Sequence, residues 1–322
     1  MYPWERIVPE QDSTLRIIHE CTKRGHQVSI THPNKLTIRD SITFVFEKKI
    51  IQFNEVEDIP TFYHSVQFEE TMVALKSYDV IFMRNNPPID TLMLNFLDSV
   101  KNDVFIINNI DGLRKANNKV YTASFDDPKN EFIPITHVSK NIEYLLKVIN
   151  ESDQEKMILK PLDGYGGSGV IVIEKRAMHN IKSLLDFYVN RSKEVSNYVI
   201  LQEYVEGAEN GDVRVLMLNG KPIGALRRRP IAGDVRSNIS VGGTVEKYDL
   251  TEEDLALCHK IGAKLVEDGI YYAGLDLIGG KLIEVNVLSP GTITDINKLN
   301  NTKIQEQIVD YLEQKIMQKQ IN

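Results

Sequence analysis

Residues 157–173 read MILKPLDGYGGSGVIVI and are the most informative part of the chain. An apolar, strand-like run ends at Lys160-Pro161, glycine fills four of the six positions 164–169, and a second apolar run follows at once. A turn so rich in glycine lets the backbone approach a polyanion closely and aim its N–H groups at it. Lys160 adds a point charge beside the same turn. The stretch therefore predicts a phosphate-binding turn between two strands.

The order of elements separates this turn from two well-known nucleotide motifs. The P-loop needs GxxxxGK[ST] at the start of a helix, and the dinucleotide fingerprint needs GxGxxG between a strand and a helix. Here both neighbours of the turn are strand-like. On this stretch alone, a hairpin with a flexible glycine turn explains the pattern equally well, so the rest of the chain has to decide.

Composition limits the class of protein. A chain of 322 residues exceeds what one hydrophobic core usually covers, so we expect two or three domains. A formal net charge of −7 argues against a general nucleic-acid binder. Cys21 and Cys258 are too few for a disulfide framework or a zinc site. Because the chain has neither a membrane-length apolar run nor a signal-peptide core at its start, we expect a cytoplasmic protein without a membrane partner.

The first 110 residues or so alternate between helix-like and strand-like segments, which predicts a small parallel α/β sheet. Residues 42–53 alternate in a way that predicts a hairpin of two short strands. The helix-like segments are 12–24 and 91–100, and the strand-like ones are 26–30, 79–84 and 104–108.

Local signals also organise the rest of the chain. Residues 112–123 have a helical pattern, Asn219-Gly220 predicts a tight hairpin, and Thr251 with Asp254 forms a capping box before a helix. The aperiodic segment 229–244 is long for a structureless loop, and such loops are often functional lids. We expect an N-terminal α/β substrate-binding domain, a lobe with the glycine turn and a C-terminal lobe, over residues 1–113, 114–200 and 201–322.

Asp276, Glu284 and Asn286 lie on two apolar strands that flank Gly279-Gly280. A two-residue turn would direct Glu284 away from Asp276, whereas a three-residue turn over 279–281 would pair them on one face. Two opposed carboxylates repel each other, and burial would increase the cost. A divalent cation resolves the conflict, and all-oxygen ligands favour Mg²⁺ or Mn²⁺ over zinc. The alternative is a solvated outer face of a hairpin.

Several further residues fit a nucleotide site. Glu203, Tyr204 and Val205 follow an apolar strand and are candidates for the wall that holds a purine. Cations occur in the predicted helix 112–123, in later strands and in the 229–244 loop, although a single Lys or Arg is more often a solvated surface charge. The candidates are Lys119, Arg214, Arg228 and Arg236, with Asn238 beside the last.

In this combination the chain resembles the ATP-grasp superfamily and, more narrowly, prokaryotic-type glutathione synthetase. The matching segments occur in family order over roughly residues 3 to 315. The glycine turn and the carboxylate hairpin are shared across the superfamily, whereas the MRxxPPxD motif at residues 83–90 and the RxN…GG loop are narrower. The segments are 82–90, 118–123, 158–167, 211–215, 236–243, 274–279 and 284–290.

The resemblance implies an ATP-grasp fold behind an N-terminal α/β domain, with ATP held between two α+β lobes and Mg²⁺ or Mn²⁺, two ions in all, beside it. It implies that γ-glutamylcysteine is phosphorylated by ATP and that glycine then attacks the acyl phosphate. It also suggests a homodimer or homotetramer. The implied ATP-binding residues are Lys119, Lys160, Gly164, Gly166, Gly167, Ser168, Gln202, Glu203, Tyr204, Val205, Asp212 and Arg214. The implied catalytic residues are Arg228, Arg236 and Asn238, the substrate-binding residues are Arg84, Asn85 and Ser289, and the metal ligands are Asp276, Glu284 and Asn286.

The sequence departs from the family pattern in two places. The family usually begins with a strand before the segment matched by Tyr2-Pro3, so either the N-terminal sheet lacks this strand or the true start lies upstream, which we favour. Ser289-Pro290-Gly291 replaces the more usual Ser-Pro-Thr, which makes glycine less certain as the amine acceptor. A ligase for another amino acid or peptide, and a catalytically inactive nucleotide-binding relative, are the alternatives.

Overall fold

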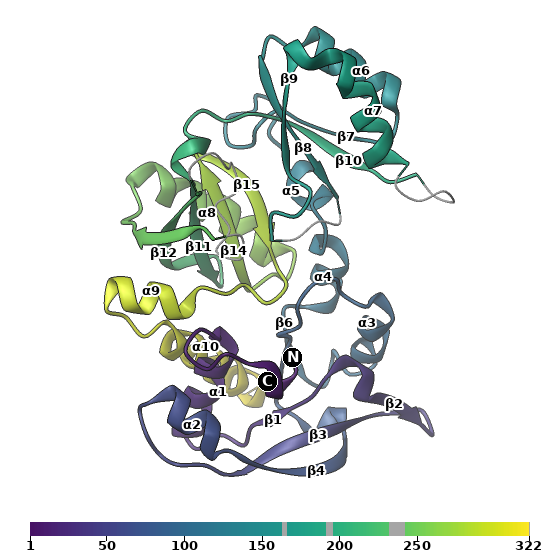
Figure 1. Ribbon diagram of the computed structural model, residues 1–322. Helices are drawn as coiled ribbons and strands as arrows, with labels where there is room; N and C mark the ends of the chain where they lie inside the picture. The colour runs from purple at the N-terminus through teal and green to yellow at the C-terminus, as the bar shows by residue number, and fades with distance from the viewer. Residues whose placement is uncertain (163–165, 191–195, 232–241, 322) are drawn as a thin grey trace.

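The computed structural model describes residues 1–162, 166–190, 196–231 and 242–321. Figure 1 shows the N-terminal residues at the bottom of the molecule, a lobe in teal at the top and a green-to-yellow lobe at the left. The C-terminal helix returns to the N-terminal part of the molecule. None of the helices in the described ranges is both long enough and apolar enough to cross a membrane.

The N-terminal domain contains, besides a pair of parallel strands, a four-stranded antiparallel sheet that the sequence did not predict. Its long strand β3 pairs with three shorter strands. Residues 42–52 form one strand instead of the predicted hairpin, because the chain reverses earlier, at Asp40-Ser41, where both residues have positive φ. The strands are β1 (Ser29–Ile30), β2 (Leu36–Arg39), β3 (Ile42–Gln52) and β4 (Gln67–Ala74).

Parallel pairing occurs between β5 (Val80–Phe82) and β6 (Phe105–Ile107), at two of the predicted strand positions. The predicted first helix is confirmed as α1, whose N-cap Asp12 accepts a hydrogen bond from the Leu15 amide. The predicted helix 112–123 is two helices, because the first ends at a cap on Asn117. The helices of this part are α1 (Ser13–Lys23), α2 (Ile59–Ser65), α3 (Thr91–Asp98), α4 (Ile110–Ala116) and α5 (Val120–Ala123).

The central lobe is an antiparallel sheet in the order β7-β10-β8-β9, with two helices on it (Figure 1). The stretch quoted first supplies β8 and β9, and the glycine turn connects them. Leu145, Leu159, Leu185 and Leu201 belong to a core that this lobe does not share with the other parts. The elements are β7 (Thr136–Ser139), α6 (Ile142–Glu151), β8 (Lys156–Pro161), β9 (Ile171–Glu174), α7 (Met178–Val189) and β10 (Val199–Glu203).

The C-terminal lobe is a sheet in the order β13-β12-β11-β14-β15. The predicted Asn219-Gly220 turn joins β11 to β12 with positive φ at both residues, and the predicted capping box of Thr251 and Asp254 begins α8. The elements are β11 (Asp212–Leu218), β12 (Lys221–Arg229), β13 (Thr244–Lys247), α8 (Glu252–Glu267), β14 (Tyr272–Ile278), β15 (Lys281–Asn286), α9 (Ile293–Asn300) and α10 (Ile304–Ile321).

The N-terminal domain and the C-terminal lobe share one hydrophobic core. Met83, Leu94 and Leu113 on one side belong to the same cluster as Val215 and Leu275 on the other. Helix α10 also packs along α1, and Arg24, the C-cap residue of α1, donates to Asp310 and Glu313 of α10. The N-terminal domain and the C-terminal lobe are therefore packed together. The central lobe has a hydrophobic core of its own.

Candidate functional site

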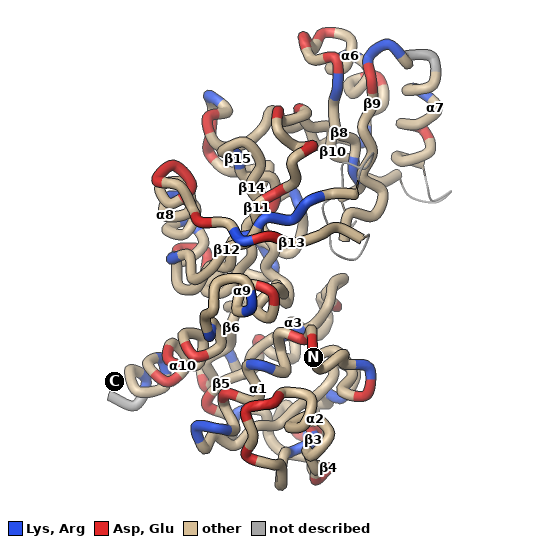
Figure 2. The backbone as a smooth tube through the Cα atoms, turned by 60° about the vertical axis from the view of Figure 1, so that its left-hand side comes forward, with Lys and Arg blue, Asp and Glu red and all other residues tan. Residues whose placement is uncertain are grey.

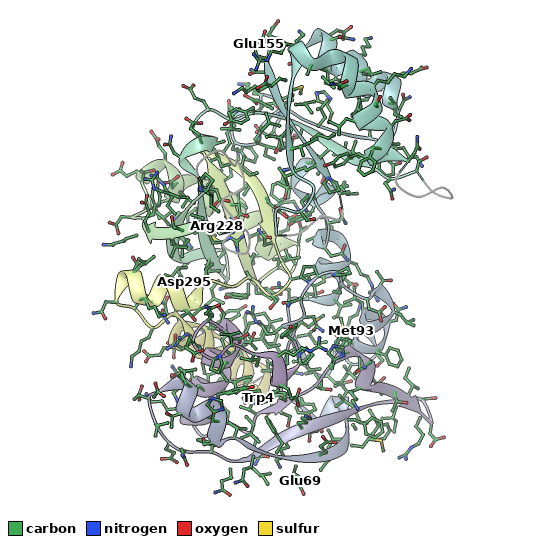
Figure 3. All side chains as sticks on the ribbon, in the orientation of Figure 1. Trp4, Glu69, Met93, Glu155, Arg228 and Asp295 are labelled. Carbon is green, nitrogen blue, oxygen red and sulfur yellow. The ribbon has the colours of Figure 1, made fainter. Side chains whose placement is uncertain are left out.

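A cleft between the central and C-terminal lobes brings together residues that are far apart in the sequence. The space between the two walls, including the part open to solvent, is about 1020 Å³. Figure 3 marks Arg228 on the C-terminal side of this region and Glu155 at the far tip of the central lobe. The predicted residues that line the cleft are Lys119, Lys160, Gly166, Gly167, Ser168, Gln202, Glu203, Tyr204, Val205, Asp212, Arg214, Arg228, Asp276, Glu284 and Asn286.

The glycine turn approaches the cleft from the central lobe. Gly166, Gly167 and Gly169 have φ of 62°, 77° and 71°, which residues with side chains rarely adopt. A Cβ on Gly169 would lie 3.0 Å from the Pro161 ring, and the Gly169 carbonyl accepts a hydrogen bond from Tyr188 Oη at 3.0 Å. The described part of the turn is thus held close to the end of β8. Gly164, also predicted to bind ATP, lies outside the described residues.

Lys160 stands at the end of β8 with only 6% of its surface exposed. Its Nζ donates to Gln202 Oε1 at 2.9 Å, and Gln202 Nε2 in turn donates to Thr136 Oγ1. Burial lowers the pKa of Lys160 to about 8, against the attraction of Glu284. The ammonium group is therefore fixed in direction and close to losing its proton at mildly alkaline pH.

We expect the affinity for ADP to fall roughly tenfold between pH 7 and pH 9, because one unit above the Lys160 pKa only about a tenth of the molecules keep the charge. Titration calorimetry without divalent metal measures this dependence. Lys160→Met is the control and should bind ADP weakly at both pH values. Equal wild-type affinities at the two pH values, or a pH dependence that survives in Lys160→Met, would contradict this role.

The carboxylate hairpin β14–β15 pairs Asp276 with Glu284 and Gly274 with Asn286, so the three predicted metal ligands share a face. The route to this pairing differs from the prediction. The turn has two residues, Gly279-Gly280, and pairs Ile278 with Lys281, as a tight turn does. A bulge between Asp276 and Leu277 then shifts the register by one residue and restores the pairing of the carboxylates.

Asp276 is the centre of a buried ion-pair network. Its carboxylate accepts from Arg214 Nε at 2.5 Å and lies 2.9 Å from Arg228 Nη2. Arg228 also binds Asp212, its partner across β11 and β12, through two hydrogen bonds. Burial alone would raise the pKa of Asp276, but Arg214 and Arg228 outweigh burial and hold it well below its usual range. Burial and then the charge of Asp276 raise the pKa of Asp212.

The other two predicted metal ligands, Asn286 and Glu284, lie beside this network. Asn286 Nδ2 donates to Asp276 Oδ2 at 3.1 Å, and Lys119 Nζ lies 3.4 Å from Glu284 Oε1. No cluster of three or more His, Cys, Asp or Glu side chains suited to a metal occurs among the described residues. The predicted set on the hairpin is a different combination of side chains, two carboxylates and an amide, all of which offer oxygen. Figure 2 shows the basic residues of β12 as a blue stretch beside β11.

The end of β10 and the residues that follow it form the edge of the cleft that adjoins both lobes. Glu203 Oε2 accepts from the Ile135 amide at 3.0 Å and from Lys281 Nζ at 3.3 Å, so it contacts the carboxylate hairpin as well as its own lobe. Tyr204 and Val205 follow it in the cleft wall. The wall also contains apolar residues that the sequence did not single out, and these suit the flat face of a base: Ile158, Val170, Ala208, Ile278 and Ile283.

The predicted substrate residues form a second group, outside the described lining of this cleft. Arg84 Nη2 donates to the Pro290 carbonyl at 3.1 Å, so the structure brings the segment that contains Arg84 and Asn85 next to Ser289. Arg236 and Asn238, the predicted catalytic residues of the 229–244 segment, lie outside the described residues. The ends of that segment belong to β12 and β13.

Sequence reasoning missed Asn108, which joins the N-terminal domain to the start of β14 and to Val287, the residue after β15. Its Nδ2 donates to the carbonyls of Tyr272 and Val287, at 2.7 and 3.1 Å, and its Oδ1 accepts from the amides of Tyr271 and Tyr272. This side chain is buried and uses both ends of its amide. A lone Asn after a short strand gives no sequence signal of such contacts.

Comparison with known proteins places the whole chain in one family. Residues 1–114 match the N-terminal domain of prokaryotic glutathione synthetase, and residues 118–301 match its ATP-grasp domain. A protein of Nostoc sp. named glutathione synthetase is 29% identical over 324 residues, which cover 98% of this chain and 96% of that protein. A protein of Gloeobacter violaceus with the same name is 32% identical over 321 residues, with coverages of 96% and 94%.

Solved structures agree on the fold. The ATP-grasp ligase PsnB, in complex with precursor peptide PsnA2 and AMPPNP, has a TM-score of 0.62 and 16% identity, with 95% of each chain covered. A RimK domain ATP-grasp protein from Sphaerobacter thermophilus also has a TM-score of 0.62, at 15% identity, over 95% of this chain and 96% of that one. At such identities the likeness concerns the fold alone. With an ATP-grasp fold and family matches over nearly its full length, the chain belongs to the prokaryotic glutathione synthetase family.

Proposed function

We propose that this protein is an ATP-dependent carboxylate–amine ligase that joins γ-glutamylcysteine to glycine and forms glutathione, ADP and phosphate. One observation carries the proposal: Lys160 and the glycine turn line the same cleft as Asp276, Glu284 and Asn286, although they come from different lobes. A cationic turn opposite a group of oxygen ligands suits a triphosphate. Membership of the family supports glutathione as the product.

The reaction would proceed in two balanced steps. A carboxylate oxygen of the cysteinyl residue forms a bond to the γ-phosphorus of ATP, and the bond from that phosphorus to the β-bridging oxygen breaks to release ADP. The uncharged amine of glycine then attacks the acyl carbon, phosphate leaves, and the proton of the amine passes to solvent or phosphate. Both steps bring anionic groups together, so the cations Lys119, Lys160 and Arg228 would lower the barrier by neutralising charge.

The donor set of the hairpin fits a hard divalent cation, since Asp276, Glu284 and Asn286 share a face and offer oxygen atoms alone for coordination. We propose that they hold Mg²⁺ or Mn²⁺, with two ions per site. When bound, the metal would offset negative charge on the phosphate oxygens. Arg214 and Arg228 balance the charge of Asp276 within the protein itself, so the carboxylate stays ionised.

The other roles are assigned by family resemblance. The segment Arg84–Asn85 would supply the peptide side of the site, and Ser289 the side of the incoming amino acid. Arg236 and Asn238 would act on the reacting carboxyl and phosphate. We place the reaction in the cytoplasm and expect a homodimer or homotetramer, which sedimentation of the purified protein measures.

ADP release tests the proposed function. With ATP, Mg²⁺ and γ-glutamylcysteine, we expect sustained release once glycine is added and only slow release without it. Mass spectrometry of the product should find glutathione. Release that needs a different amino acid would reassign the acceptor, and the absence of release with any peptide would leave a nucleotide-binding protein without ligase activity.

A further inference from the structure

The loop between β15 and α9 has an unusual backbone. Ser289 and Thr292 have φ of 45° and 77°, in the left-handed region that residues with a side chain rarely occupy. Such conformations persist where surrounding contacts fix them, and they gather at ligand sites. The loop from Ser289 to Thr292 therefore needs contacts from outside itself to keep its shape.

Two side chains hold the middle of this loop at a single atom. The Pro290 carbonyl oxygen accepts from Arg84 Nη2 at 3.1 Å and from Tyr272 Oη at 3.4 Å. Just beyond the loop, the Ile293 amide donates to Ser13 Oγ at 3.2 Å. Arg84 and Ser13 belong to the N-terminal domain, whereas the loop continues directly from the carboxylate hairpin. Side chains of the N-terminal domain thus hold a loop that belongs to the C-terminal lobe.

Arg84 is enclosed by protein on all sides. Only 4% of its surface is exposed, Nε donates to Thr14 Oγ1 at 3.1 Å, and the guanidinium lies 5.6 and 5.5 Å from the ring centres of Phe82 and Tyr272. Its Nη1 atom is also buried and has no hydrogen-bond partner within the described parts of the chain. Because the Arg84 guanidinium is so enclosed, it would act on a substrate through the loop whose Pro290 carbonyl it binds.

We propose that Arg84 is a positioning residue that fixes the Ser289–Thr292 loop and thereby sets the affinity for the amine acceptor. The inference rests on the proposed function, because it takes Ser289 as the neighbour of the incoming amino acid. In this role Arg84 holds the loop and does not contact the peptide directly. If Arg84 has this role, its loss should raise the KM for the acceptor but not the KM for the peptide. Distortion of the loop should weaken binding of the acceptor and leave binding of the peptide nearly unchanged.

Arg84→Met tests this role, because methionine keeps the bulk and the apolar contacts but donates no hydrogen bond. We expect the KM for glycine to rise roughly tenfold or more, with the KM for γ-glutamylcysteine changed by less than about twofold. Arg84→Lys keeps a charge and one donor, so it should recover part of the affinity. Tyr272→Phe removes the second donor to the same carbonyl and should shift the glycine KM in the same direction by a smaller factor.

Arg24→Gln is the matched control. Arg24 also joins the end of α1 to the C-terminal part of the chain, but its partners are Asp310, Glu313 and the Glu306 carbonyl, all in α10 and none in the loop. Its replacement should lower the melting temperature without moving either KM. A rise in the peptide KM alone for Arg84→Met, or no change in any constant, would overturn the positioning role. If Arg84→Met does not fold, an unchanged glycine KM in Tyr272→Phe overturns it. A wild-type protein inactive with glycine would instead refute the proposed function.

Discussion

Asp276→Asn lowers the turnover number by roughly two to three orders of magnitude, while the dissociation constant for ATP changes by less than about tenfold. Asparagine has nearly the same shape but removes the charge that we assign to metal coordination beside the transferred phosphate. Arg214 and Arg228, which the carboxylate pairs in the free protein, remain and keep the cleft attractive to phosphates. Steady-state kinetics and equilibrium binding of a non-hydrolysable ATP analogue measure the two effects separately.

Asp268→Asn is the matched control for this substitution. Asp268 is also a paired carboxylate with little of its side chain exposed. Its partners are Lys115, Lys264 and Tyr121, and it is absent from the described lining of the cleft. It should lose stability with turnover nearly unchanged. If Asp276→Asn weakened nucleotide binding as much as it slowed turnover, Asp276 would be a general structural support of the cleft and not a ligand for the metal at the reacting phosphate.

Lys160→Met weakens ATP binding by roughly a hundredfold, the second large effect that we expect. The ammonium group is buried and held by Gln202, so no other cation can easily replace it. Methionine removes a group whose charge is costly to bury, so the melting temperature of the nucleotide-free protein should stay within a few degrees of the wild type. The rise in melting temperature on adding ATP should largely disappear.

Thermal melting with and without ATP measures this difference directly. Lys147→Met, on the exposed face of α6, is the control and should keep the full ATP-induced rise. A Lys160→Met protein that keeps the wild-type rise would show that Lys160 does not contact the nucleotide, and the glycine turn would then lose its assigned role.

Local chemistry explains which parts of the fold could be predicted from the sequence. The Asn219-Gly220 turn and the capping box of Thr251 and Asp254 depend on neighbouring residues alone, and both are present in the structure. The antiparallel sheet of the N-terminal domain was missed because residues 36–39 and 67–74 were not predicted as strands, which left β3 without its two main partners. Asp40-Ser41, where the chain reverses, carries no glycine to mark the turn.

In the candidate site, too, the residue types could be predicted from the sequence, whereas the contacts that depend on the folded structure could not. Residue types and spacing selected Lys160, Asp276, Glu284 and Asn286, and the cleft contains all of them. The sequence predicted the pairing of Asp276 with Glu284 correctly but assigned it to a three-residue turn. The structure has a two-residue turn and a bulge after Asp276, and the bulge depends on how the hairpin packs. The contacts of Asn108 with Tyr272 and of Arg84 with Pro290 join residues more than 150 positions apart, and the sequence gives no register for them.

A crystal structure with AMPPNP and Mn²⁺ tests the central claim most directly, because the anomalous signal of manganese locates the metal independently of the nucleotide. We predict phosphate groups that contact Lys160 and the amides of the glycine turn on one side. On the other side, manganese peaks should lie against Asp276, Glu284 and Asn286. A nucleotide bound away from the glycine turn, or manganese on another surface, would contradict the assignment of these two distant segments to one triphosphate site.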